Sequence, residues 1–181
     1  MLSVWNQIKK IHQDQHKLDN MNKFILSFFY IGLIKKAPGS FGSALAIIFW
    51  LLCNKIFPNI NLLWPIFLTI ILIYGSFFIK HYAKDTGDID DKSIVLDEVL
   101  GQIMVLEIIF FYFNLDRNLL NYENILVIFL SFIAFRIFDI TKIFPINFID
   151  KKVKNGFGVM LDDVVAAIFA IIILIIAKNY I

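Results

Sequence analysis

The chain has only one cysteine, Cys53, and only two arginines among its 181 residues. A single cysteine excludes an internal disulfide and a cysteine-based zinc site, and no Cys-x5-Arg motif is present for a cysteinyl-phosphate intermediate. The scarcity of arginine also excludes the arginine–histidine signature of the vanadium-peroxidase-like lipid phosphatases. With a formal net charge of +2 and no basic stripe interleaved with aromatic residues, nucleic acid is not an expected partner.

Apolar residues, in contrast, are abundant. They make up 59% of the chain and give a mean hydropathy of +0.75, whereas soluble domains contain about 45–50% apolar residues. Lipid is therefore an expected part of the solvent. We predict an all-α fold, a multi-helix integral membrane bundle with about five spans and a short N-terminal interfacial helix. Residues 1–22 are expected to be a polar cytosolic lead-in, and residues 23–181 a single membrane-embedded domain.

Five apolar runs approach the roughly 20 helical residues that a hydrocarbon core requires. These runs cover residues 41–57, 62–79, 94–113, 125–143 and 157–177. Residues 24–34 are apolar but too short to span, so an interfacial or re-entrant helix is expected there.

The distribution of cations predicts the orientation of these spans, because Lys and Arg remain on the cytosolic side. With the N-terminus inside, thirteen of the 17 Lys and Arg residues lie inside or at the inner boundary. Only Lys55, Arg117 and Lys178 lie outside, and Arg136 falls within a span. The segments with unusual polar chemistry then all meet at the cytosolic end of the bundle.

Six charged residues lie near that predicted boundary: Asp97, Glu98, Arg136, Asp139, Asp162 and Asp163. An ionisable group inside a span costs about 2.5–3.5 kcal/mol even on the lenient insertion scale, which favours a functional role. The structural alternative is that these groups reach water or form ion pairs, and Arg136 and Asp139 have the i,i+3 spacing of such a pair. Clustered carboxylates without a nearby cysteine or a clear histidine ligand favour Mg²⁺, with Mn²⁺ and Ca²⁺ as alternatives.

The segment from Lys35 to Ser43 combines two lysines, a proline and two glycines directly before an apolar helix. Free N–H groups at a helix start can bind phosphate, so this segment is a candidate phosphate cradle. Many helices begin in this way, so the segment alone is not specific.

Four segments together resemble the phosphatidylglycerophosphatase A family. The matching stretches, in order, are residues 37–43, 83–98, 135–150 and 156–163. The resemblance implies an all-helical, Mg²⁺-dependent enzyme that hydrolyses phosphatidylglycerophosphate to phosphatidylglycerol and phosphate at the bacterial inner membrane. Ile143 and Phe144 depart from the usual proline-plus-aromatic pair, and Lys92 stands where glycine is common.

These observations give a hypothesis for the site. The candidate metal ligands are Asp97, Glu98, Asp162 and Asp163. The candidate phosphate ligands are Lys36, Gly39, Ser40, Gly42, Ser43, Arg136 and Lys142. Asp139 is expected to orient Arg136 or to position the metal. Asp85 and Asp90 are expected to complete the metal shell or to act as acid or base. The candidate catalytic residues are therefore Asp85, Asp90, Asp97, Glu98 and Asp139. Whether water or an aspartate attacks the phosphorus stays open.

A second hypothesis is a membrane cation transporter or channel that uses intramembrane carboxylates. It predicts charges near the bilayer midplane and on both sides, whereas here they gather at one boundary. We therefore expect a multi-pass protein of the bacterial inner membrane, in contact with the bilayer lipid and with its site facing the cytosol. The sequence does not indicate the oligomeric state.

Overall fold

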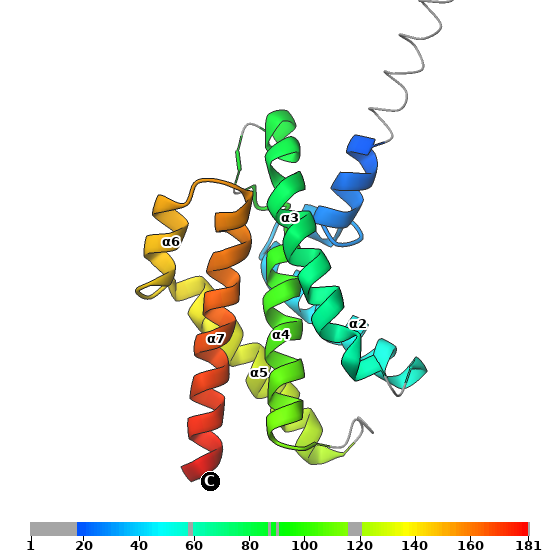
Figure 1. Cartoon of the computed structure of the whole chain (residues 1–181), viewed down its shortest axis with the longest axis vertical. Coiled ribbons are helices and arrows are strands. Elements are labelled where there is room, and N and C mark those ends of the chain that lie inside the picture. The colour runs from blue at the N-terminus through cyan, green and yellow to red at the C-terminus, as the bar shows by residue number, and fades with distance from the viewer. Residues whose placement is uncertain (1–17, 58–59, 87, 90, 116–120, 181) are drawn as a thin grey trace, which may run out of the picture.

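A computed structural model describes residues 18–57, 60–86, 88–89, 91–115 and 121–180. All regular elements in these ranges are helices, which confirms the predicted all-α class (Figure 1). Besides the helical residues 18–26, they are η1 (Ile31–Leu33), α2 (Pro38–Ile56), η2 (Ile60–Leu62), α3 (Trp64–Thr86), α4 (Leu96–Tyr112), α5 (Tyr122–Thr141), α6 (Ile146–Lys152) and α7 (Gly156–Tyr180). Residues 1–17 of the predicted lead-in lie outside the described residues.

Helix α4 forms the centre of the bundle. It packs most extensively against α7 and also contacts α2, α3 and α5, and in Figure 1 it lies between α7 and α3 with α5 crossing behind. Its 17 residues extend for about 25 Å at 1.5 Å per residue, less than the roughly 30 Å of a hydrocarbon core. Most of α4 is buried in the bundle, including Leu96 and Asp97 of its first turn.

Four helical segments in the described residues are long and apolar enough to cross a membrane. They are Pro38–Ile56, Ile60–Ala83, Tyr122–Thr141 and Gly156–Lys178. Large apolar side chains such as Ile66, Ile70 and Phe77 on α3 are exposed, as expected for a surface that faces lipid. The predicted span over residues 94–113 corresponds to the shorter central helix, so the total of five spans stays a prediction.

The α4–α7 crossing is close because small residues line it. Ala166, Ala167 and Ala170 of α7 are fully buried. A Cβ atom built at Gly101 of α4 would lie 2.5 Å from the Phe135 ring and 3.1 Å from the Asp163 carbonyl oxygen. Small residues allow helix backbones to approach in this way in membranes, and here the approach brings the second turn of α7 beside the start of α4.

The N-terminal segment packs against the residues directly before α4. Residues 18–26 are helical, but positive φ angles at Phe28, Phe29 and Tyr30 interrupt the helix before η1. The short helical segment expected over residues 24–34 is therefore present but broken. The Val95 amide donates to the Leu26 carbonyl at 3.0 Å, which fixes the backbone directly before α4.

Candidate active site

A cavity of about 370 Å³ lies at the end of the bundle where α2, α4 and α7 begin and α5 ends. Its lining comes from all four helices and from the segment before α4. The lining residues are Ala37, Pro38, Gly39, Ser40, Asp91, Lys92, Ile94, Asp97, Glu98, Arg136, Asp139, Ile140, Lys142, Asp162 and Asp163. Segments that are distant in sequence thus meet in one place, as the sequence predicts.

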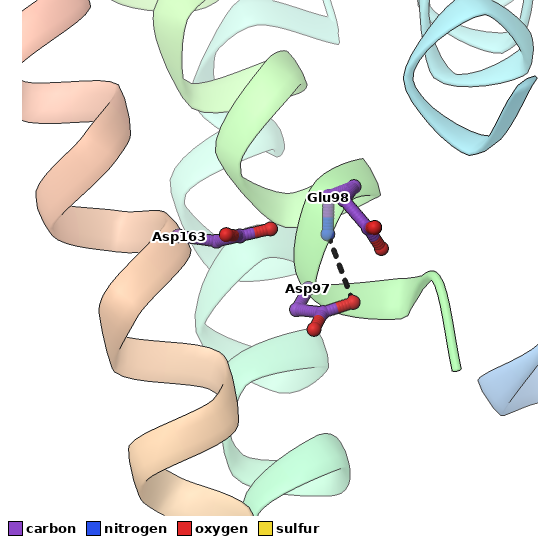
Figure 2. A group of neighbouring side chains, drawn as sticks. All are labelled: Asp97, Glu98 and Asp163. Atoms are coloured by element: carbon purple, nitrogen blue, oxygen red, sulfur yellow. Dashed lines mark hydrogen bonds between the residues drawn. The ribbon is translucent and has the colours of Figure 1, made fainter. Parts of the chain in front are cut away.

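Three carboxylates form the centre of this cavity. Asp97 and Glu98 occupy the first turn of α4, where the positive end of the helix dipole favours negative charge. Asp163 points from α7 toward this pair (Figure 2). One carboxylate oxygen from each residue lies within 4.8 Å of the other two. The Glu98 amide donates to Asp97 Oδ1 at 3.1 Å, which fixes the orientation of the Asp97 carboxylate.

This carboxylate cluster, defined as Asp97, Glu98 and Asp163, is buried. Asp97 is 8% exposed and Asp163 3% exposed. Within the described part of the chain, Glu98 Oε2 and Asp163 Oδ2 are buried and accept no hydrogen bond. Such atoms normally have a partner, and three close carboxylates repel each other unless a cation lies between them. An oxygen-only donor set of this kind fits a hard divalent cation such as Mg²⁺.

Asp163 lies well inside its helix. Asp163 is the eighth residue of α7, so it is about 10 Å along the helix axis from the first residue. Asp162, one residue earlier, is 4% exposed, and its Oδ1 accepts the Asp163 amide at 3.1 Å. Both carboxylates are therefore recessed from the α7 terminus.

Arg136 of α5 connects the cluster to α2. Its Nη1 atom lies 2.5 Å from Asp139 Oδ2 and 4.0 Å from Glu98 Oε1. The same nitrogen donates to Ser43 Oγ at 3.4 Å. The i,i+3 ion pair with Asp139 therefore forms, and it holds a guanidinium group against the carboxylate cluster.

Lys142 links the end of α5 to α6 and α7. It follows the last residue of α5 in a left-handed conformation, with φ 41°. Its Nζ atom donates to Asp150 Oδ1 of α6 at 2.8 Å and to Asp162 Oδ2 of α7 at 2.7 Å. Burial alone would lower the Lys142 pKa, but the hydrogen bonds to Asp150 and Asp162 outweigh it and raise the pKa above its usual range.

Replacement of Lys142 by Met is expected to destabilise the protein by about 2 kcal/mol, because Asp162 would remain buried without its cation. This value is lower than for a fully buried pair, because Lys142 is partly exposed and solvent screens its charge. The stabilisation is fully present below about pH 10.4, the usual lysine pKa, and is lost as pH rises through the raised pKa. Thermal unfolding in detergent measures the change. Lys151→Met on exposed α6 is the control, and equal melting temperatures for the two variants would contradict the bridging role.

The start of α2 forms the other wall. Ser43 Oγ donates to the Gly39 carbonyl at 3.0 Å, and Gly39 and Ser40 line the cavity. Gly42 instead packs against Val95, so it is absent from the cavity lining. Ala37, which precedes the helix, has φ 49°. The first turn of α2, whose amides have no partner within the helix, therefore lies at the cavity.

The structure brings most of the predicted site residues together. Lining the cavity are Gly39, Ser40, Asp97, Glu98, Arg136, Asp139, Lys142, Asp162 and Asp163. Ser43 contacts Arg136, whereas Lys36 is exposed and outside the lining. Asp85 belongs to α3, but the structure does not describe its side chain, and Asp90 lies outside the described residues.

Three polar residues near the cavity were absent from the predicted site. Asp91 and Lys92 line it, and Asp150 pairs with Lys142. Asp91 Oδ1 accepts the Ser93 amide at 2.8 Å. The density of charge between residues 84 and 92 was an available signal for the first two, but it does not indicate which of these side chains face the carboxylates.

Comparison with known proteins gives consistent matches. A model of the family described as Phosphatidylglycerophosphatase A matches residues 24–178. A phosphatidylglycerophosphatase A of Haemophilus influenzae is 37% identical over 173 residues, which cover 93% of this chain and 92% of the relative. That of Escherichia coli is 30% identical over 172 residues, 93% and 90% of the two chains. A Bacteroides thetaiotaomicron protein, whose name proposes a phosphatidylinositol-3-phosphatase, is 28% identical over 151 residues, 83% and 89%. No solved structure matches the chain.

Proposed function

Because the chain belongs to the phosphatidylglycerophosphatase A family and is therefore a phosphoric monoester hydrolase, we propose that it hydrolyses phosphatidylglycerophosphate to phosphatidylglycerol and inorganic phosphate. The observation that carries this proposal is the buried carboxylate cluster beside Arg136, inside a cavity at one end of an apolar helical bundle. Carboxylates that hold a metal beside a guanidinium group suit phosphoryl transfer, in which positioning and charge stabilisation supply most of the catalysis.

We also propose that the site uses Mg²⁺. Asp97, Glu98 and Asp163 would hold the ion, since two of their buried oxygens have no hydrogen-bond donor among the described residues. Asp162 would be a weaker candidate ligand than the sequence indicated, because one of its oxygens already accepts from Lys142. When bound, Mg²⁺ neutralises charge on the phosphomonoester and lowers the pKa of a coordinated water.

The remaining groups bind and orient the phosphate. Arg136, held by Asp139, presents its guanidinium nitrogens at the cavity wall, where they can donate to phosphate oxygens. The free amides at the start of α2, next to Arg136, would add further donors. Lys142 holds α5, α6 and α7 together through its ion pairs. We therefore assign it a positioning role in preference to direct binding of the phosphate.

The location of the protein follows from the same features. The bacterial relatives and the apolar helices identify a membrane protein. We propose that this membrane is the inner membrane and that the cavity faces the cytosol, because the cation-rich segments share its end of the bundle. A headgroup phosphate would then reach the cavity from the inner leaflet while the acyl chains remain in lipid.

The cation transporter hypothesis has no support. Its carboxylates would lie near the midplane and at both ends of the helices, whereas the carboxylate cluster lies at the start of α4, at one end of the bundle. None of the relatives reported above is a transporter.

The test is phosphate release by the purified chain in detergent micelles that contain phosphatidylglycerophosphate. We expect release with added Mg²⁺, a drop of at least about tenfold in EDTA, and recovery when Mg²⁺ is restored, as for an activity that needs a bound metal. Phosphatidylinositol 3-phosphate is the competing substrate, because of the name of the Bacteroides relative. Absence of release would contradict the activity, faster release from the inositol lipid would contradict the substrate, and full activity in EDTA would contradict the metal.

A further inference from the structure

The proposed substrate carries two phosphates of different kinds. The terminal phosphomonoester is removed, whereas the phosphodiester that joins glycerol to the diacylglycerol remains in the product and keeps one negative charge. The carboxylate cluster and Arg136 are placed for the first group. The phosphodiester must then lie nearer the mouth of the cavity. Because it is a group of the proposed substrate, this inference rests on the proposed function.

Among the described residues, three cations line the cavity: Lys92, Arg136 and Lys142. Arg136 is paired with Asp139, and Lys142 with Asp150 and Asp162. Lys92 forms no ion pair with any residue that the structure describes, and its side chain is exposed. It is thus a lysine at the solvent edge of the cavity whose donors are open to a ligand.

The backbone that carries Lys92 is well fixed. On one side, Asp91 Oδ1 accepts the Ser93 amide at 2.8 Å, and the Ile94 amide donates to the Asp91 carbonyl at 2.9 Å. On the other side, the Ser93 hydroxyl lies 2.8 Å from Tyr82 Oη. Gly32 also packs against the Ser93 carbonyl, where a Cβ atom would overlap it. Lys92 therefore projects from a turn whose backbone is fixed by hydrogen bonds, which reduces the entropy cost of binding a ligand.

The charge of the cavity favours such a cation in this chain. Six carboxylates line it, from Asp91, Asp97, Glu98, Asp139, Asp162 and Asp163, against three cations. A divalent ion bound to the carboxylate cluster serves the phosphomonoester, but a phosphodiester near the acidic wall is repelled unless another cation faces it. We propose that the Lys92 ammonium group binds the phosphodiester of the lipid, and that Lys92 thereby contributes to the selection of lipids that carry this second phosphate.

The contact has a distinctive kinetic consequence. The phosphodiester is unchanged in the substrate, the transition state and the phosphatidylglycerol product. An interaction that is equal in the ground state and the transition state changes KM and leaves kcat unaltered. It also strengthens inhibition by the product, while inhibition by inorganic phosphate, which has no diester, does not depend on it.

The experiment uses the full chain in detergent micelles, with Lys92→Gln, Lys92→Arg and the control Lys151→Gln on exposed α6. For Lys92→Gln we expect a KM for phosphatidylglycerophosphate that is about five- to tenfold higher at unchanged kcat, the usual size of a charge-assisted contact at an exposed edge. Competitive inhibition by short-chain phosphatidylglycerol should weaken by a similar factor, and inhibition by inorganic phosphate should stay the same. Lys92→Arg should restore KM, and Lys151→Gln should resemble the unmodified protein.

Two outcomes would overturn the assignment. These are an unchanged KM in Lys92→Gln, with or without a fall in kcat, and a loss of phosphate inhibition equal to that of phosphatidylglycerol inhibition. The second would assign Lys92 to the phosphomonoester. Failure of the unmodified protein to hydrolyse phosphatidylglycerophosphate would instead refute the proposed function, so the two failures are distinguishable.

Discussion

Replacement of Asp163 by Asn is expected to lower kcat for phosphate release by about 1,000-fold, the scale on which loss of a group that organises transition-state charge acts. Asn has nearly the same shape as Asp but no charge, and it would remove one of the three proposed metal ligands from the carboxylate cluster. The Oδ2 atom of Asp163 accepts no hydrogen bond from the described residues, so the substitution removes no hydrogen bond at that atom. Initial rates in detergent across a Mg²⁺ titration measure the effect, with Glu123→Gln on exposed α5 as the control.

A stability measurement separates this functional role from a structural one. In EDTA, Asp163→Asn should unfold at the same temperature as the unmodified protein or higher, because one of three mutually repelling carboxylates has been neutralised. Added Mg²⁺ should then raise the melting temperature of the unmodified protein more than that of the variant. A variant that keeps its full rate, or one whose melting temperature falls in EDTA, would remove Asp163 from the proposed metal site.

The second large effect is expected at Gly39, where replacement by Ala should lower kcat/KM by about 100-fold. A Cβ atom at this position would overlap Glu98 Oε1 and lie 3.1 Å from Arg136 Nη2. Arg136 is held by Asp139 and Ser43, so the added methyl group displaces the Glu98 carboxylate and crowds the guanidinium group, and misplacement of such groups by about 1 Å can cost this factor. The rate with phosphatidylglycerophosphate measures the loss.

Gly75→Ala is the matched control for Gly39→Ala. Its Cβ atom would also be crowded, but only by the flexible end of the Met160 side chain, which can move at small cost. We expect Gly75→Ala to retain at least half of the activity. Equal losses in the two variants would indicate a general sensitivity of helix packing instead of a specific collision with Glu98 and Arg136.

The helices were largely predictable because lipid requires long apolar runs. The runs at residues 41–57, 125–143 and 157–177 differ from α2, α5 and α7 by a few residues at their ends. Helix α4 was predicted as an ordinary span, since apolar content does not reveal that its neighbours are other helices. Helix α6 was missed because seven residues behind a proline carry too little periodicity, and the break within residues 24–34 depends on contacts with Ser93 and Val95.

The site shows a similar division. Asp97, Glu98 and Asp163 were predictable because charge is costly inside apolar helices, and Arg136 for the same reason. Asp150 could not be predicted, because its link to Lys142 depends on how α6 folds back over α7. Lys92 follows three acidic residues at positions 88, 90 and 91, so the sequence favours local ion pairs, and only the fold places the lysine at the cavity.

The position of Asp163 along α7 also bears on the size of the substrate. Asp97 and Glu98 lie in the first turn of α4, whereas Asp163 lies about 10 Å along the axis from the first residue of α7. The first two turns of α7 therefore project past the carboxylate cluster. We expect this projection to slow the hydrolysis of phosphomonoesters on bulky, folded carriers relative to phosphate on a flexible lipid headgroup, independently of any attraction between charges.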